Sequence, residues 1–212
     1  MAGASVTGDT TSPATAVSLF GLPCWINAEG ERFVNETCHY SERCKVAAQQ
    51  TNHFCWGVTD SSNPYVETLE ATIAEGGVQV YKADTLEELA EMIGVPVDTF
   101  LATVEKYNAD YAAGNGDTVY GMPESDMIPL LLAPFYAQRV QPLNMFCMVS
   151  LKVDDNCHVL NSKGEAVPNL YGVGEVAVGN CFFESYACSG SAIMIALSTG
   201  KIAALDAIAN MQ

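Results

Sequence analysis

Positively charged side chains are scarce in this sequence of 212 residues. Nine lysines and arginines stand against 25 aspartates and glutamates, which gives a formal net charge of −16. A chain of this charge repels nucleic-acid phosphates and anionic membrane surfaces unless its basic residues cluster. The basic residues are scattered from Arg32 to Lys201, so we expect no nucleic-acid partner.

The sequence also lacks a segment that predicts membrane insertion or export. No apolar run is both long enough and free enough of charge to predict a membrane span. Residues 1–17 are rich in Ala, Gly, Ser and Thr, without the basic start or the apolar centre of a secretory signal. The sequence leaves the cellular compartment open.

None of the eight cysteines forms a C-x-x-C pair, which weakens zinc-site and redox-motif interpretations. We therefore expect no metal site. With 49% apolar residues the chain can bury a sizeable core, as one large domain or two small ones. Most cysteines are then expected to be buried free thiols, as in a reducing compartment, with a disulfide between neighbours as the alternative.

The stretch from Asn169 to Asn210 organises the C-terminal part of the chain. A short apolar run at 169–174 predicts a buried strand, and residues 192–209 predict a helix. Only Lys201 and Asp206 are charged within that helix. We therefore expect it to be buried on most sides.

The residues that lead into this helix, Ser189, Gly190 and Ser191, are small. The first amide N–H groups of a helix have no partner inside it and carry partial positive charge. A phosphate, or the negative pyrimidine edge of a reduced flavin, could therefore approach these amides closely. A well-capped core helix without a ligand is the alternative.

A dinucleotide-like pattern precedes the same helix. Gly172, Gly174 and Ala177 fit G-x-G-x-x-A after a strand. That pattern requires a helix to begin at once, and Gly179–Asn180 stand where the helix should run. We therefore do not interpret these residues as a phosphate-binding loop.

Two helices earlier in the chain have clear start signals. Thr85 and Glu88 form a capping box, and Gly94 ends the first helix. Asp98 is predicted to cap the second, which runs to Gly114. Strands or hairpins are expected over 22–36, 54–58, 135–140 and 151–160.

Five stretches together resemble the flavoprotein superfamily of fumarate reductases and 3-ketosteroid dehydrogenases. They are EGERFVNE (29–36), KADTLEELA (82–90), TVEKYN (103–108), LKVDDNCHVLNSKGEAVPNLYGVGE (151–175) and SGSAIMIALSTGKIAA (189–204). The resemblance implies an α+β fold. Residues 1–128 would form a capping domain, and residues 129–212 the C-terminal strands and buried helix of a Rossmann-like FAD-binding domain.

The same resemblance implies FAD as the cofactor of an oxidoreductase that acts on CH-CH bonds. A hydride would pass between flavin N5 and one carbon of a C–C or C=C bond in a small-molecule substrate, while a protein group handles the proton on the neighbouring carbon. Glu175, taken together with Gly174, is similar to the glutamate near the flavin ribityl chain. The amides of Ser191, Ala192 and Ile193 would face the flavin ring.

The family's N-terminal βαβ unit, with its G-x-G-x-x-G loop, does not occur in this sequence. Without it the pyrophosphate of FAD has no cradle. We expect this missing half to come from the same protein or from a partner chain, and the isolated chain to bind FAD weakly and to be inactive. Its uncovered apolar surface would favour self-association into a homo-oligomer.

The charged substrate contacts of fumarate reductases have no counterpart at the matching positions. Tyr40 stands where that branch has its proton-donating arginine, Ala187 where it has a second arginine, and Met145–Phe146 where it has a histidine. Bidentate arginines are the usual clamp for a buried carboxylate. A small dicarboxylate is therefore not the expected substrate.

The 3-ketosteroid dehydrogenase pattern fits better. By resemblance, Tyr40 would be the base, while the Tyr186 hydroxyl and the Gly190 N–H would polarise a substrate carbonyl. A free phenol has a pKa of about 10, so Tyr40 needs surroundings that favour its phenolate; the alternative role is packing. Two further readings stay open: a reductase of an unsaturated acid with Tyr40 as proton donor, and a catalytically silent fragment or half of a split enzyme.

Overall fold

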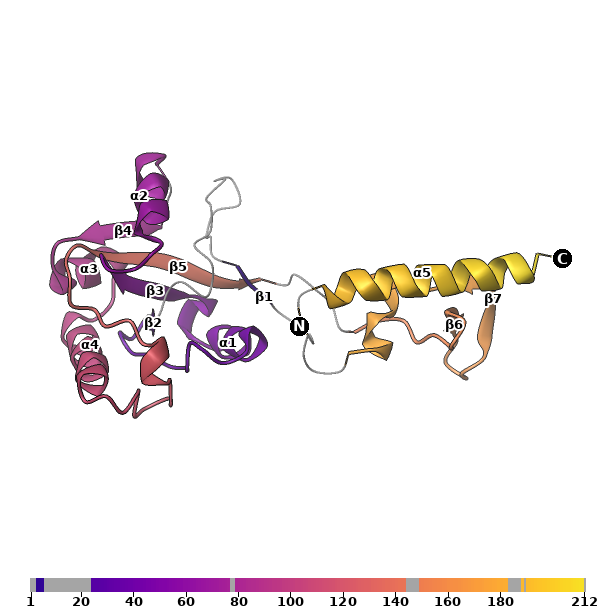
Figure 1. Ribbon diagram of the computed structural model, residues 1–212, viewed down its shortest axis with the longest axis horizontal. Helices are drawn as coiled ribbons and strands as arrows, with labels where there is room; N and C mark the ends of the chain where they lie inside the picture. The colour runs from indigo at the N-terminus through magenta and orange to yellow at the C-terminus, as the bar shows by residue number, and fades with distance from the viewer. Residues whose placement is uncertain are drawn as a thin grey trace. The chain divides into compact units, whose positions relative to one another are not determined.

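The computed structural model describes residues 3–5, 24–76, 79–143, 149–182, 188 and 190–211. Its contacts divide the chain into two compact units. The first unit is Gly3–Leu143, and the second is Asn144–Gln212 together with Met1–Ala2. Figure 1 labels the helices and strands of both.

The first unit contains a five-stranded antiparallel sheet. Its longest strand, β5 (Phe135–Leu143), pairs along one edge with β3 (Cys55–Asp60), which in turn pairs with β2 (Cys24–Ile26). The other edge of β5 is shared by β4 (Val80–Ala83) and β1 (Gly3–Ser5). β5 therefore has a strand on both sides and holds the sheet together.

Four helices accompany this sheet: α1 (Tyr40–Ala47), α2 (Val66–Ala74), α3 (Leu86–Ile93) and α4 (Val97–Ala112), with 3₁₀ turns η1 (Thr51–His53) and η2 (Glu124–Asp126). The predicted capping box of α3 is present, since Thr85 Oγ1 accepts the N–H of Glu88 at 3.1 Å. Gly94 ends α3 in the left-handed conformation, with φ 74°. These two local signals fix both ends of α3.

The start of α4 differs from the prediction. Pro96, not Asp98, occupies the N-cap position, and the helix begins at Val97. Asp98 lies in the first turn, where its carboxylate still favours the positive end of the helix. The acidic residue was therefore a helix-start signal, displaced by two positions from the cap itself.

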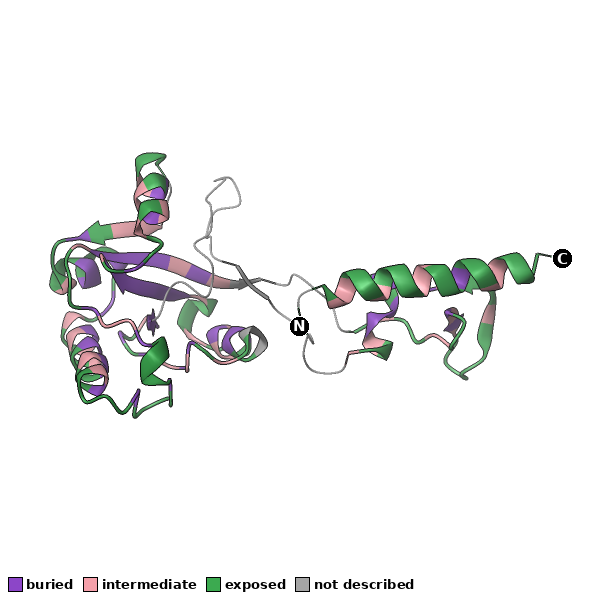
Figure 2. Cartoon of the chain, viewed as in Figure 1, coloured by how far each residue is buried: buried purple, intermediate pink, exposed green. Residues whose placement is uncertain are grey.

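The core of the first unit lies between the sheet and helices α3 and α4. Figure 2 shows β3 and β5 largely buried, and the buried faces of α3 and α4 turned inward. The cluster comprises Cys24, Ile26, Trp56, Val58, Ala83, Leu89, Ala90, Ile93, Val95, Phe100, Val104, Leu130, Phe135 and Ala137. Because Phe135 and Ala137 belong to it, β5 is an integral part of this unit.

The division between units differs from the predicted domain boundary. The sequence placed the boundary after residue 128, whereas the contacts divide the chain after Leu143. The reason is β5, whose residues pair with β3 and β4. Assignment of the units as a capping domain and part of an FAD-binding domain stays a prediction.

The second unit has a two-stranded sheet of β6 (His158–Leu160) and β7 (Ala166–Tyr171), the 3₁₀ segment η3 (Gly174–Asn180) and the helix α5 (Ser191–Ala209). β7 begins earlier than the predicted strand at 169–174, and its residues are exposed or half-buried. The hairpin predicted over 151–160 is present, with Val153 bridged to Val159. A 3₁₀ segment follows Gly172 and Gly174, in place of the α-helix that a phosphate loop requires.

The prediction that α5 is buried is wrong for the described residues. Figure 2 shows α5 exposed along most of its length, and Ala203 is its one buried residue. Large apolar side chains stand in solvent, among them Ile193, Met194, Leu197, Leu205 and Ile208. A helix that is apolar all round needs cover on several sides, and among the described elements α5 packs mainly against η3.

The prediction that no segment is long and apolar enough to span a membrane also needs correction. By length and composition alone, α5 is apolar enough to cross a membrane. Lys201 and Asp206 are the two charged residues within its 19 residues. One helix of this kind is weak evidence for a span.

The cysteines follow the prediction in part. Seven cysteines lie within the described residues and all are free thiols. Cys24, Cys44, Cys55 and Cys157 are buried, whereas Cys181 and Cys188 are exposed. Burial raises the pKa of Cys44 to about 11, so this thiol stays protonated near neutral pH.

Candidate functional site

The first turn of α5 is the candidate cofactor site of the second unit. Gly190 holds the N-cap position with φ 91°, a conformation that favours glycine. A Cβ placed on Gly190 would meet no described atom within 4 Å. Ser191 is tied locally, since its Oγ donates to the carbonyl of Cys188 at 2.8 Å. Gly190 is therefore exposed at the start of the helix, whereas Ser191 and Ala192 are half-buried.

Gly174 lies against the same helix, beside Ala196 and Thr199. It is buried with φ 62°, and its N–H donates to Thr199 Oγ1 at 2.9 Å. A Cβ on Gly174 would lie 3.5 Å from the Cβ of Ala196. Glu175 follows it, exposed, in η3. The structure thus brings Gly174 and Glu175 to the N-terminal half of α5.

The residues at this helix start fit the electron-rich edge of a flavin ring. The helix is 19 residues long, so its start carries the partial positive charge of a full macrodipole. No carbonyl of α5 itself lies four residues before Ser191, Ala192 or Ile193, and the N–H of Ser191 donates instead to the carbonyl of Cys188 at 3.2 Å. No side chain of the described residues caps this end. That the N–H groups of Ser191, Ala192 and Ile193 face the ring of FAD stays a prediction.

The structure describes only part of the predicted catalytic tyrosines. Tyr40 is the first residue of α1, but its side chain lies outside the described part of the chain, as does Tyr186. Tyr40 belongs to the first unit, and Gly190 belongs to the second. The catalytic roles of Tyr40, Tyr186 and Gly190 therefore stay predictions.

A cluster of buried charges, which the sequence did not predict, surrounds Arg32 in the first unit. Its Nε and Nη2 donate to the Glu36 carboxylate at 2.9 and 2.5 Å, and its Nη1 lies 3.1 Å from Asp117 Oδ2. The guanidinium lies over the rings of Tyr107 and Tyr120, with 4.7 and 5.4 Å to their centroids. Arg32 therefore joins the 24–36 hairpin to α4 and to the loop after it.

The electrostatics of this cluster keep Arg32 charged. Although burial opposes it, the hydrogen bond and charge of Glu36 hold the pKa of Arg32 above its ordinary value. Burial also raises the pKa of the Cys24 thiol and of the Tyr107 phenol. Both groups are therefore neutral near pH 7, and the cluster stabilises the hairpin without an ionised nucleophile.

Sequence signals for this cluster were present but ambiguous. Arg32 and Glu36 both lie in the stretch 29–36, four positions apart. Charged residues are usually exposed, and the sequence offers no partner at a fixed spacing for Asp117. The apolar residues Phe33 and Val34, which stand between Arg32 and Glu36, were the one local hint of a buried ion pair.

The second unit has its own charged cluster, around His158. Its Nδ1 lies 2.9 Å from Asp154 Oδ2, and its Nε2 lies 3.0 Å from Asp206 Oδ2. Tyr171 donates its hydroxyl proton to the same Asp206 oxygen at 2.8 Å. The hydrogen bond to Asp154, together with the charge of Asp206, raises the pKa of His158. This cluster fastens the β6–β7 sheet to α5.

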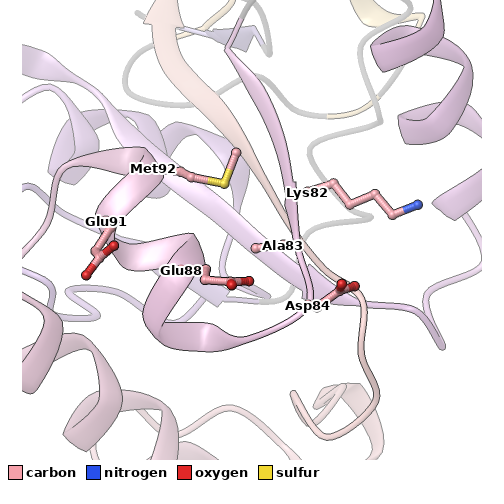
Figure 3. Close-up of a pocket in the computed structure, with 6 residues that line it drawn as sticks. All are labelled: Lys82, Ala83, Asp84, Glu88, Glu91 and Met92. Atoms are coloured by element: carbon pink, nitrogen blue, oxygen red, sulfur yellow. The ribbon is translucent and has the colours of Figure 1, made fainter.

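Two hollows among the described residues of the first unit are lined by no predicted site residue. One of about 400 Å³, shown in Figure 3, lies between β4 and α3 and is lined by Lys82, Ala83, Asp84, Glu88, Glu91 and Met92. The other, of about 410 Å³, lies beside Arg32 and Tyr120. Lys82 is paired with Glu70 of α2, so the first hollow presents mainly carboxylates. The described residues contain no group of three or more side chains placed to hold a metal.

Comparison with known proteins assigns the chain to a family. A family model described as an FAD binding domain matches residues 23–191. NADH:acrylate oxidoreductase of Vibrio harveyi is 32% identical over 205 residues, which cover 92% of this chain and 20% of that protein. The 3-oxosteroid 1-dehydrogenase of Mycolicibacterium smegmatis is 28% identical over 85% of this chain and 37% of its own length. The chain thus spans well under half of these relatives.

Solved structures resemble the fold over nearly the whole chain. The open conformation of a flavocytochrome c3 fumarate reductase matches with a TM-score of 0.70 and 25% identity, covering 95% of this chain and 35% of that one. A 3-ketosteroid Δ1-dehydrogenase from Sterolibacterium denitrificans, solved with 1,4-androstadiene-3,17-dione, matches with a TM-score of 0.78 and 23% identity. This match covers 97% of this chain and 42% of the dehydrogenase chain. The mixed helix-and-strand fold is shared with these flavoproteins.

Proposed function

This chain belongs to the FAD binding domain family, and on that premise we propose that it is part of an oxidoreductase of the 3-ketosteroid dehydrogenase type. The cofactor is FAD, as in the flavoproteins that it resembles. The proposed reaction moves a hydride between flavin N5 and a carbon of a C–C or C=C bond next to a carbonyl. When bound, the flavin supplies the hydride acceptor or donor.

The open backbone at the start of α5 is the observation that carries this proposal. Gly190 is exposed in a conformation that a side chain would strain, and the space beyond it is open. A backbone N–H presented from such a position suits an oxyanion that develops on a substrate carbonyl. Ser191, Ala192 and Ile193 would bind the flavin ring through their own N–H groups.

The protein groups share the proton and the carbonyl between them. In the dehydrogenating direction, Tyr40 takes the proton from the carbon next to the one that loses the hydride. Tyr186 and the N–H of Gly190 donate hydrogen bonds to the carbonyl oxygen, which stabilise the charge that forms there. In the reducing direction, the phenol of Tyr40 returns the proton.

A reductase of an unsaturated acid is the second candidate. The relative that is 32% identical is named NADH:acrylate oxidoreductase, which favours a substrate with one carboxylate. Such a substrate would use Tyr40 as proton donor. The absence of arginine at positions 40 and 187 weighs against a dicarboxylate, because each carboxylate needs its own clamp.

A partner for FAD binding is also part of the proposal. The chain spans 20% and 37% of the two curated relatives described above, and the G-x-G-x-x-G pattern does not occur in its sequence. We expect the phosphate-binding half to be supplied by the same protein or by another chain. The chain by itself is then a weak FAD binder without catalytic activity, the third reading.

The test uses the complete FAD-loaded protein and two substrates, a 3-ketosteroid and acrylate. Faster turnover of the steroid supports the first candidate, and faster turnover of acrylate supports the second. Tyr40→Phe should lower kcat by about 100-fold or more, since general acid–base catalysis contributes about 10²–10⁴. Tyr65→Phe is the matched control, because Tyr65 is an exposed tyrosine of the same unit. Equal rates for both variants would refute the role of Tyr40. No turnover of either substrate would favour the third candidate, a catalytically silent protein.

A further inference from the structure

The buried guanidinium of Arg43 bonds back to Glu36, and Tyr40 lies in the chain segment between these two residues. Arg43, on α1, is 2% exposed, and its Nη1 donates to the backbone carbonyl of Glu36 at 2.6 Å. Its guanidinium lies over the ring of Trp25, 5.5 Å from the centroid. Tyr40 lies between the two ends of this contact, four residues after Glu36 and three before Arg43.

Glu36 is itself held on three sides. Its carboxylate accepts the N–H of Trp25 at 2.8 Å and the bidentate pair from Arg32. Its carbonyl accepts Arg43. The carbonyl that accepts the bond from Arg43 is therefore fixed to β2 and to the charged cluster around Arg32. The bond thus attaches α1 to a fixed part of the unit.

The backbone between the two ends is ordered by short-range bonds. Asn35 Oδ1 accepts the N–H of Thr37 at 2.9 Å, and the carbonyl of His39 accepts the N–H of Glu42 at 2.8 Å. These bonds lie within the turn. Arg43 adds a bond from α1 to the carbonyl of Glu36, and this bond is charge-assisted and therefore stronger than a neutral one.

We propose that Arg43 is a positioning residue for Tyr40, which fixes the first turn of α1 relative to the hairpin. The inference rests on the proposed function, since it takes Tyr40 as the proton-transfer residue. A guanidinium is costly to bury, and burial lowers the pKa of Arg43. An apolar side chain would fill the same space without that desolvation, so packing alone gives no reason for an arginine here.

The position of the first turn of α1 matters for the rate. A displacement of about 1 Å in a reacting group lowers the rate on the order of 100-fold. Loss of the bond from Arg43 to Glu36 should therefore reduce kcat with little change in KM, because Arg43 contacts neither substrate nor flavin in this proposal. A purely structural residue would instead lower the amount of folded protein and leave kcat per folded molecule unchanged.

The experiment compares Arg43→Met, Arg43→Lys and the control Lys45→Met in the complete FAD-loaded protein. Lys45 lies on the same helix, in an exposed pair with Glu42 at 3.1 Å. We expect Arg43→Met to lower kcat by about 10- to 100-fold with KM within about threefold, and Arg43→Lys to recover part of kcat because an ammonium still donates to the Glu36 carbonyl. The control should match the parent protein. Unchanged kcat in Arg43→Met, or no recovery in a folded Arg43→Lys, would overturn the proposal.

Hydrogen exchange separates this inference from the proposed function. The amides of residues 42–47 should exchange about tenfold faster in Arg43→Met than in Lys45→Met, because local opening becomes easier. If Tyr40→Phe leaves the rate unchanged, the proposed function fails, whereas faster exchange would still show that Arg43 anchors α1. Equal exchange in the two variants would overturn the anchoring itself.

Discussion

Replacing Arg32 with methionine tests how the first unit tolerates buried charge. Arg32 serves two carboxylates, Glu36 and Asp117, whose side chains are 2% and 1% exposed. Methionine keeps much of the aliphatic stem and removes the guanidinium. Both carboxylates then lose their cation inside the protein, although Glu36 keeps the N–H of Trp25 at 2.8 Å and Asp117 keeps that of Tyr120 at 3.0 Å.

The magnitude follows from the cost of leaving a buried charge without its partner. Removing one member of a buried ion pair costs about 3–5 kcal/mol. We expect Arg32→Met to lower the free energy of unfolding by an amount in that range, with the retained N–H bonds setting the upper limit. Typical domains are stable by about 5–15 kcal/mol, so the change should be a large fraction of the total.

The pH dependence has a definite sign. Burial raises the pKa of Glu36, against the opposing hydrogen bond and charge of Arg32, and loss of Arg32 raises it further. A carboxyl whose folded pKa exceeds its unfolded value of about 4.3 stabilises the fold fully below that value and loses the effect as the pH rises through the folded pKa. The deficit of Arg32→Met should therefore be smaller at pH 5.5 than at pH 7.5.

Urea unfolding monitored by tryptophan fluorescence is the assay. Both tryptophans, Trp25 and Trp56, lie in the first unit, so the signal reports on that unit alone. Lys45→Met is the control, because an exposed ion pair contributes about 0–1 kcal/mol. A deficit below about 1 kcal/mol for Arg32→Met, or one that grows as the pH is lowered, would refute the reasoning.

Three further predictions concern packing, pH and surface. Leu89→Ala should lower the unfolding free energy by about 2–5 kcal/mol in the same urea assay, because Leu89 is fully buried in the core. The raised pKa of His158 means that its contacts with Asp154 and Asp206 stabilise fully below about pH 6.5 and weaken as the pH rises through the folded value; hydrogen exchange of β6 and β7, corrected for intrinsic rates, should show this in the parent protein and not in His158→Gln. Leu197→Glu should reduce binding of an apolar-surface dye and shift the isolated chain toward monomer in sedimentation, since Leu197 is 65% exposed; an unchanged dye signal would contradict this.

Elements with strong local signals were predictable from the sequence. Thr85, Glu88 and Gly94 fix α3 through contacts within a few residues, so no knowledge of the rest of the fold was needed. The strand at 135–140 was also predictable. Its partners were not, because strand pairing across a sheet joins segments far apart in sequence; β5 pairs with β3 and β4 and so falls in the first unit.

Burial was the property that sequence pattern predicted least well. For α5, composition indicated apolar sides all round, but burial depends on the elements that cover the helix. For Arg32 and Glu36 the error is the opposite one. Charged side chains are expected to be exposed, but these two lie buried as an ion pair. In the candidate site, the open start of α5 at Gly190 was foreseeable from small residues alone, whereas the anchoring of α1 by Arg43 depends on a tertiary contact with Glu36.

The buried charges of the first unit and the exposed apolar side chains of α5 differ in how far neighbouring groups compensate for them. The buried charges of the first unit are balanced inside it, because Arg32 is bonded to Glu36 and lies beside Asp117. The exposed apolar side chains of α5 are not balanced by any described residue of this chain, and its charged Asp206 is turned toward His158 and Tyr171. Burying that face is favourable in proportion to its area. A surface that covers this face would therefore stabilise the same helix whose first turn is proposed to hold FAD, so cofactor binding and cover of α5 should strengthen each other.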